Sequence, residues 1–338
     1  MKKTKLLTLF PLMFAGSLSA CANNAHANVG LLYCSSEANS KYQVDVVKAE
    51  LENKGLSTKL ISFTDSNDLA TILRGQIGNV DSLYIPTDNQ CASNTEIINT
   101  IVKENKKPVF AGEENICSGC GAITLSISYY NIGVKTGKMA VDVLLGKQDI
   151  STLPIAYDEN PVKEYNKSFC EAMDITVPSD YVAIGEGKSV VASLGSNQNT
   201  NNTKFTVGIC QLVTHDALDA ATRGFMDAVK VGLGEDNVTF DVQNAAGEAN
   251  NCTTIVGSFV SKNVSLIMAN ATPALQAAAN ATKTIPVLGT SVTEYGTALN
   301  IPDFKGVVGG NISGTSDLAP LSTQAQMLND VFAPFFKK

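Results

Sequence analysis

The stretch VGICQLVTHDALDAATRGFMDAVKVGLGEDNVTFDVQ, residues 207–243, contains an apolar run, an amphipathic segment and a second apolar run. Residues 207–211 and 238–242 are short apolar runs typical of strands, whereas residues 217–232 have apolar side chains at the helical period. A helix between two strands predicts a βαβ unit, in which the two strands are parallel. The expected fold class is therefore α/β.

The same order of elements occurs earlier in the chain. Val29-Gly30 matches Val207-Gly208, and residues 108–110 match residues 286–288, both at an offset of 178 residues. A repeat of this length is a whole lobe, because the repeats of solenoid proteins are about 20 to 50 residues long. We therefore expect two similar lobes: lobe A, residues 28–128, and lobe B, residues 204–310.

Composition limits the possible partners. The chain has 338 residues, of which 44% are hydrophobic and 17% are charged, as in a soluble protein large enough for two domains. The 25 lysines and arginines and the 32 acidic residues give a formal net charge of −7. Because phosphate groups bind to basic surfaces, we expect no nucleic acid partner.

Residues 1–20, MKKTKLLTLFPLMFAGSLSA, have a basic start and an apolar run too short to span a membrane, which predicts a secretory signal peptide. Cys21 follows at once, in the pattern (lipobox) at which bacteria lipidate the cysteine, and residues 21–27 would then be a tether. The alternative is cleavage after Ala25-His26-Ala27, which would discard Cys21. Both routes predict an extracytoplasmic protein, either a lipoprotein anchored to the bacterial cell membrane or a periplasmic protein.

Groups needed for catalysis are scarce. His26 and His215 are the only histidines, and no Gly-x-Ser-x-Gly motif surrounds a serine, which argues against a Ser-His-Asp hydrolase. Cys117 and Cys120 have redox or metal spacing, but no second cysteine pair at zinc-ligand spacing accompanies them. A local disulfide or two buried thiols is expected there. We expect no enzymatic activity, no cofactor and no metal.

Polar loops follow the expected strands in both lobes. In open parallel sheets, ligands bind at the carboxyl ends of strands, where helix N-termini present free amides. Thr272-Pro273 precedes an alanine-rich helix as a predicted cap, which leaves amides free for a carboxylate. Asp88 and Glu113 or Glu114 would balance an ammonium from the other lobe. Simple helix capping is the competing interpretation of each residue, and equivalent loops in both lobes favour a ligand site.

Several stretches resemble ABC-transporter substrate-binding proteins with the type I periplasmic-binding-protein fold, in particular the group of tryptophan and aromatic amino-acid-binding lipoproteins. They are residues 207–243, 269–286 (ANATPALQAAANATKTIP), 314–317 (GTSD), 32–40 (LYCSSEANS), 84–89 (YIPTDN) and 128–140 (SYYNIGVKTGKMA). The resemblance implies two Rossmann-like lobes with parallel sheets, joined by three crossovers. It also implies that they close on a small ligand and deliver it to an ABC permease in the membrane, without catalysis.

Carried over by position, the resemblance implies twelve ligand-binding residues. In lobe A and the helix after it they are Ser36, Asn39, Thr87, Asp88, Glu113 and Tyr129. In lobe B and its crossover they are Gln211, His215, Thr272, Thr290, Ser291 and Asp317. With the polar loops, the resemblance predicts a zwitterionic, aromatic amino acid as ligand. The chain has no tryptophan, so ring stacking would involve Tyr129, Tyr33 or Tyr130.

The order of the two halves departs from the family, which usually begins with the segment that resembles residue 204 onward. The chain is therefore expected to be circularly permuted and monomeric. The further expected pieces are about 150–187 and the C-terminal helix 320–336 in lobe A, a crossover helix 129–149 on lobe B, and a flexible linker 195–203 (GSNQNTNNT).

Two function classes share this fold and cleft. The first is a transport receptor that delivers its ligand to an importer. The alternative is a sensory protein that presents its ligand to a membrane receptor. A neighbouring permease gene would favour the first class.

Overall fold

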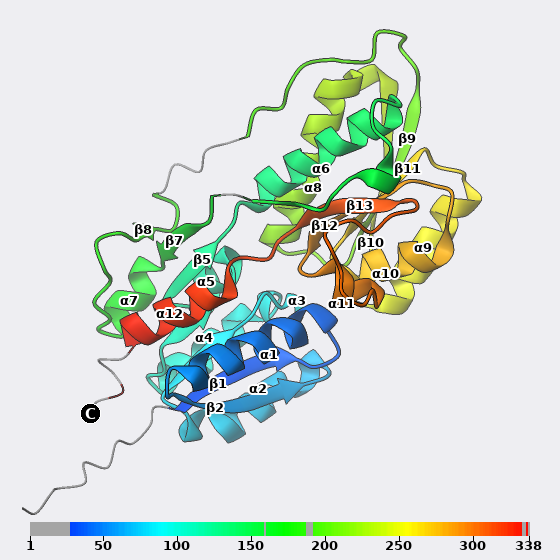
Figure 1. Cartoon of the computed structure of the whole chain (residues 1–338). Coiled ribbons are helices and arrows are strands. Elements are labelled where there is room, and N and C mark those ends of the chain that lie inside the picture. The colour runs from blue at the N-terminus through cyan, green and yellow to red at the C-terminus, as the bar shows by residue number, and fades with distance from the viewer. Residues whose placement is uncertain (1–27, 159, 187–191, 333–335, 337–338) are drawn as a thin grey trace, which may run out of the picture.

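The computed structural model describes residues 28–158, 160–186, 192–332 and 336, so residues 1–20, Cys21 and the tether lie outside it. Within these residues the chain forms two α/β lobes (Figure 1). The strand order is β2-β1-β3-β4-β5-β7-β8 in lobe A and β10-β9-β11-β12-β13-β6 in lobe B. Neighbouring strands are parallel except β5 and β7, which confirms the predicted α/β class with parallel sheets.

Lobe A contains the first five strands of the chain and two that follow the first crossover. Its strands are β1 (Asn28–Cys34), β2 (Ser57–Phe63), β3 (Ser82–Ile85), β4 (Val109–Ala111), β5 (Ile123–Ser126), β7 (Val162–Tyr165) and β8 (Val182–Ala183). Its helices are α1 (Ala38–Asn53), α2 (Ser66–Gln76), η1 (Ile77–Asn79), α3 (Asn89–Ala92), α4 (Thr95–Glu104), α5 (Glu114–Cys120), α7 (Lys167–Ala172) and α12 (Leu321–Phe332).

Lobe B contains the remaining elements. Its strands are β6 (Ala156–Tyr157), β9 (Phe205–Gln211), β10 (Val238–Asn244), β11 (Leu266–Asn270), β12 (Val287–Val292) and β13 (Ile312–Ser316). Its helices are α6 (Tyr129–Leu144), η2 (Ile150–Thr152), α8 (Asp216–Leu233), η3 (Glu235–Asn237), α9 (Ala249–Ser261), α10 (Thr272–Ala281) and α11 (Tyr295–Leu299). In the described part of the chain, no helix has both the length and the hydropathy to cross a membrane.

Central and edge strands differ in burial. Every residue of β3, β4, β5, β11, β12 and β13 is buried. The edge strands β2 and β10 contain exposed and partly exposed residues. Helices on both faces of a parallel sheet account for the continuous apolar runs of its central strands. The loops at the carboxyl ends of these strands therefore carry the polar residues.

Three short connections join the lobes, at residues 127–128, 158–161 and 317–320, of which residue 159 lies outside the description (Figure 1). The backbone N–H of Ser128 donates to Oδ2 of Asp158 at 3.1 Å, which links the first connection to the second. The hydroxyl of Tyr129 donates to Oδ2 of Asp317 at 3.1 Å, which links the first to the third. A fourth connection runs from β8 to β9 and includes residues outside the description.

The boundaries differ from the expected ones in the middle of the chain. Residues from about 150 were expected in lobe A, but β6 pairs with β13 in parallel and Ile155 is buried in the core of lobe B. The chain returns to lobe A only at β7. Lobe B also extends beyond residue 310, because β13 belongs to its sheet. The short strand β6 satisfies backbone groups on the edge of β13 that would otherwise be unpaired.

Helix α12, near the end of the chain, packs in the core of lobe A. Leu321, Leu328 and Phe332 are buried with the residues of β1 and α1. Its buried Gln324 accepts from the hydroxyl of Tyr84 at 2.8 Å and donates to two backbone carbonyls of lobe A. Because a buried amide is costly without partners, these bonds specify where the helix docks.

The predicted flexible linker 195–203 instead contacts lobe B. The backbone N–H of Gln198 donates to the carbonyl of Gly232 at 2.7 Å. The side chain of Asn199, only 3% exposed, donates to the carbonyl of Leu233 at 3.2 Å. The last carbonyl groups of a helix have no N–H partners within the helix. Here the linker provides N–H donors for the last carbonyl groups of α8. Flexibility inferred from polar composition was wrong for this part of the linker.

Helices α6 and α8 approach closely through glycines. A Cβ on Gly224 would overlap the carbonyl oxygen of Tyr130, and a Cβ on Gly133 would overlap that of Ala221. On the other flank of α6, the Thr136 hydroxyl lies 2.7 Å from that of Thr315 in β13. The crossover helix is thereby fixed to lobe B.

We expect Gly224→Ala to lower the free energy of unfolding by about 1–3 kcal/mol, because the added methyl group has no space between the two backbones. Urea denaturation measures the change. Gly257→Ala in α9 is the control, since nothing lies within 4 Å of the added methyl group and alanine is the better helix former. Equal effects of the two substitutions would contradict the close packing.

Candidate functional site

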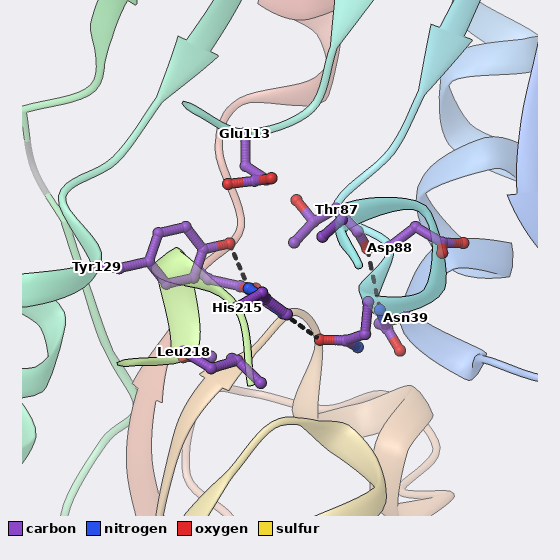
Figure 2. A pocket seen from close by; sticks show the side chains of 11 residues that line it. Asn39, Thr87, Asp88, Glu113, Tyr129, His215 and Leu218 are labelled. Carbon is purple, nitrogen blue, oxygen red and sulfur yellow. Dashed lines mark hydrogen bonds between the residues drawn. The ribbon is translucent and has the colours of Figure 1, made fainter. Parts of the chain in front are cut away.

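A small cavity lies between the lobes, at the carboxyl ends of the strands (Figure 2). It has room for about one water molecule, with a volume of about 10 Å³. The residues that line it are Asn39, Thr87, Asp88, Asn89, Ala92, Glu113, Tyr129, His215, Leu218, Ser291 and Asp317. Figure 2 shows Glu113, Tyr129 and His215 converging on this space from different elements.

The lobe A wall contains two buried carboxylates that cap helices. Asp88 follows β3, and its two oxygens accept from the backbone N–H groups of Cys91 at 2.8 Å and Cys34 at 2.6 Å. Glu113 follows β4 and accepts from the N–H groups of Asn115 at 2.8 Å and Ile116 at 2.6 Å. A carboxylate at the N-cap position of each helix therefore satisfies free amides at the starts of α3 and α5.

These carboxyl groups lack a counter-charge. Burial raises the pKa of Glu113 to about 8 and also raises the pKa of Asp88. Behind this wall, Oε2 of Glu37 accepts from Nδ2 of Asn89 at 2.9 Å, and burial raises the pKa of Glu37 to about 8. Among the residues that the structure describes, no lysine or arginine lines the cavity. These carboxyl groups can therefore ionise at neutral pH only when a positively charged group from outside the cavity wall binds beside them.

Tyr129 and Asp317, on the first and third connections, form the wall at the hinge between the lobes. The Tyr129 hydroxyl donates to Oδ2 of Asp317, while Oδ1 of Asp317 is buried without a hydrogen-bond partner. Burial raises the pKa of Asp317 to about 6. An unpaired carboxylate oxygen in a cavity wall is a ready acceptor for an N–H donor.

The lobe B wall is formed by neutral groups. Nε2 of His215 donates to Oδ1 of Asn89 at 3.3 Å, across the gap between the lobes, and Nδ1 of His215 is buried without a partner. Burial lowers the pKa of His215 to about 4, so its imidazole is neutral at pH 7. Ser291 has φ of 52° and its buried hydroxyl has no partner. No side chain caps α8, whose first turn carries Leu218.

Eight of the twelve predicted ligand-binding residues line the cavity, and four do not. Ser36 is exposed in the turn after β1, where its hydroxyl donates to the carbonyl of Thr64 at 3.3 Å. Gln211 bonds within lobe B instead: it donates to Asp219 at 2.6 Å and accepts from Thr222 at 2.7 Å. Both residues organise loops next to the cavity.

Thr272 and Thr290 are also directed elsewhere. The hydroxyl of Thr290 lies 3.2 Å from that of Thr315, between two strands of the sheet. Thr272 was expected to cap α10, but the cap residue is Ala271, with φ of 94°, and Thr272 is the first helical residue. The chain turns at Ala271, which has a positive φ, so the helix begins one residue earlier than the Thr-Pro pattern predicts.

Sequence reasoning missed three lining residues. Asn89 and Ala92 belong to α3, a four-residue helix too short to produce a hydrophobic period. Leu218 lies in the predicted helix, where an apolar residue is expected to face the core. Asn89 stands in the quoted YIPTDN stretch next to Asp88, and its polar position after a strand was an available signal. Cys117 and Cys120 are buried free thiols in α5.

Comparisons with known proteins give a family match. A sequence model described as ABC transporter substrate binding protein matches residues 24–186 and 206–338. A Tyrosine-binding protein from Clostridioides difficile (strain R20291) is 38% identical over 154 residues, which are 44% of this chain and 42% of that protein. The chain thus matches less than half the length of this curated relative.

Solved structures add the fold. A carbohydrate transporter solute binding protein from Agrobacterium radiobacter, in complex with D-arabinose, matches 92% of this chain and 89% of its own, with TM-score 0.59 and 14% identity. This match confirms the predicted two-lobed fold. An ABC domain in complex with L-Trp from Streptococcus pneumonia matches 45% of this chain and 52% of its own, with TM-score 0.43 and 30% identity.

We expect the free energy of unfolding without ligand to fall as the pH rises from about 6.5 to 8. Glu37 and Glu113 have raised pKa values, so the folded state binds more protons than the unfolded state in this range, and Glu164, with a pKa raised to about 7, acts in the same direction. His215 has a lowered pKa and acts in the opposite direction, but only between about 4 and 6.5. Urea denaturation at several pH values measures the slope.

The Glu113→Gln variant should have a flatter slope over this range, because it removes one raised pKa. Glu52→Gln is the matched control, since Glu52 is a surface group whose pKa is lowered by its bond with Lys48 and is ionised throughout. An unchanged slope in Glu113→Gln would show that Glu113 is not a proton-binding group of the folded state.

Proposed function

The chain belongs to the ABC transporter substrate-binding protein family, and from this premise we propose that it captures a zwitterionic, aromatic amino acid between its lobes for import. Members of this family bind a ligand and transfer it, so the chain is a binding protein and not an enzyme. The observation that carries the proposal is a cavity lined by three buried carboxyl groups and, among the described residues, by no lysine or arginine. Such a wall requires a ligand with a positively charged group.

The ammonium group of the ligand would lie beside Asp317 and Glu113. Oδ1 of Asp317 is the unpaired acceptor, and an ammonium there would bring that carboxyl group to its ionised form. Asp88 and Glu113 have backbone N–H donors on their oxygens but retain lone pairs for a further donor. Opposite charges in a buried cavity supply the strong contact of the complex.

The carboxylate of the ligand would face lobe B. The uncapped N-terminus of α8 and the free hydroxyl of Ser291 are the donors there. Tyr129 supplies a ring for aromatic stacking. The 38% identity to a protein named Tyrosine-binding protein supports an aromatic amino acid.

Ligand entry requires the lobes to open. A cavity of about 10 Å³ is too small for an amino acid, so the described conformation is a closed one. Opening breaks the bond between His215 and Asn89, which spans the gap, and bends the three short connections. Closure on a ligand by bending at such connections is the hinge mechanism of two-lobed binding proteins.

The closed, liganded form would act as a monomer and dock on an ABC permease in the membrane. Outside the described residues, Cys21 would carry the lipid that holds the protein at the outer surface of the membrane.

We expect Cys21→Ser to release the protein from the membrane fraction into the soluble fraction, because the thiol that carries the diacyl anchor is gone. Cell fractionation with immunodetection measures this. Cys34→Ser, in the described core, is the control and should leave the distribution unchanged. A wild-type protein that is already soluble and begins at residue 28 would instead support cleavage after Ala27.

The permuted order is also proposed. It is supported by α12, which follows lobe B in the sequence but packs in lobe A beside α1. A chain that starts at residue 192 and joins residue 338 to residue 28 through a short flexible peptide should fold and bind with unchanged affinity. Loss of folding in that reordered chain would count against an exchange of halves.

We expect Asp317→Asn to weaken amino-acid binding by about 2 kcal/mol or more, because a neutral amide cannot balance a buried ammonium. A thermal-shift screen of the twenty amino acids identifies the ligand, and calorimetry gives its dissociation constant. Asp303→Asn, at an exposed position, is the control. Failure of every amino acid in the screen would end the amino-acid proposal, and an unchanged constant would remove Asp317 from the site.

A further inference from the structure

The cavity wall is acidic. Asp88 and Glu113 line it from lobe A, Asp317 lines it where the third connection leaves β13 of lobe B, and each is at least 96% buried. Among the described residues, no lysine or arginine lines either side. Glu37 stands behind Asn39 and Asn89 and adds a fourth carboxyl group, one oxygen of which has no partner. A group with a full positive charge therefore has several acceptors within one small volume.

Apart from the carboxyl group of Asp317, the lobe B lining offers only neutral donors to a ligand carboxylate. His215 is neutral at pH 7, because burial lowers its pKa to about 4. The positive end of the α8 dipole is already opposed by Asp216 and Asp219 in the first turn of the helix. The hydroxyl of Ser291 is a single neutral donor. A carboxylate placed here would be desolvated without a counter-ion from the protein, and the buried carboxyl groups of the cavity would repel it once they are ionised.

We propose that the ammonium group alone decides recognition in this cavity and that the ligand carboxylate is dispensable, so that the site also takes primary amines that lack a carboxylate, such as arylalkylamines. This inference rests on the proposed function and says which ligand group decides recognition at that site. The geometry that carries it is the unpaired Oδ1 of Asp317 among three buried carboxyl groups, in a cavity whose described lining contains no lysine or arginine. The net charge of −7 attracts cationic ligands over a longer range as well.

The test compares three ligands that differ by one group. L-tyrosine carries both charges, tyramine lacks the carboxylate, and 3-(4-hydroxyphenyl)propionate lacks the ammonium. L-tryptophan, tryptamine and indole-3-propionate form a second series. Dissociation constants are measured by calorimetry on the full wild-type chain at pH 7. We expect the amine to bind within about tenfold of its amino acid or more tightly, and the acid to bind at least about 100-fold more weakly.

Three variants separate the contributions. Asp317→Asn should weaken the amino acid and the amine alike, whereas Ser291→Ala, which removes a donor to the carboxylate, should retain amino-acid binding. Asp303→Asn, at an exposed position, is the control and should leave both affinities unchanged. Thermal melting of each variant without ligand confirms that it is folded. Loss of amino-acid binding in a folded Ser291→Ala protein would overturn the inference, because the carboxylate would then be a principal contact.

The outcomes distinguish this inference from the proposed function. An amino acid that binds while its amine binds at least about 100-fold more weakly overturns the inference and leaves the proposed function intact. Amines that bind while every amino acid fails support the inference and overturn the amino-acid proposal. Failure of both classes overturns both.

Discussion

Carboxyl groups buried where the strands of lobe A end are the constraint on which the site depends. Asp88 and Glu113 cap α3 and α5, so their position is fixed by the helices that begin there. An ionised carboxyl group is stable in a protein interior when hydrogen bonds and a counter-charge are both present. Backbone amides supply the hydrogen bonds, and a cationic ligand would supply the charge. The lobes thus form a site whose carboxyl groups are balanced in charge only when such a ligand binds.

One of the buried carboxyl groups that need a counter-charge, that of Asp317, lies on a connection between the lobes. Asp317 lies on one connection, and Tyr129, which donates to it, begins α6 after another. A positive group beside Asp317 would therefore touch both lobes through their hinge. A ligand shifts the equilibrium between the open and closed lobes only by the difference between its affinities for these two states. A ligand that contacts both lobes beside Asp317 binds the closed state more tightly and therefore favours closure.

Each lobe is assembled from pieces distant in the chain that pack tightly together. The glycine contacts between α6 and α8 join the crossover helix to lobe B, and the buried Gln324 joins α12 to lobe A. Close packing and satisfied buried amides resist bending within a lobe. Opening of the lobes would therefore bend the short connections between them.

The sequence by itself determined the class, the two lobes and the acidic loops. Strands buried on both faces need continuous apolar runs, and the helical period marks the segments between them, so the repeat at 178 residues was visible without coordinates. Only the tertiary structure decided which polar loop residues face the cavity. Thr290 and Ser291 are neighbours in β12, yet Thr290 bonds to Thr315 inside the lobe while Ser291, at positive φ, lines the cavity. Successive strand residues point to opposite faces, and the direction of a side chain in a loop is set by local backbone angles that residue type does not specify.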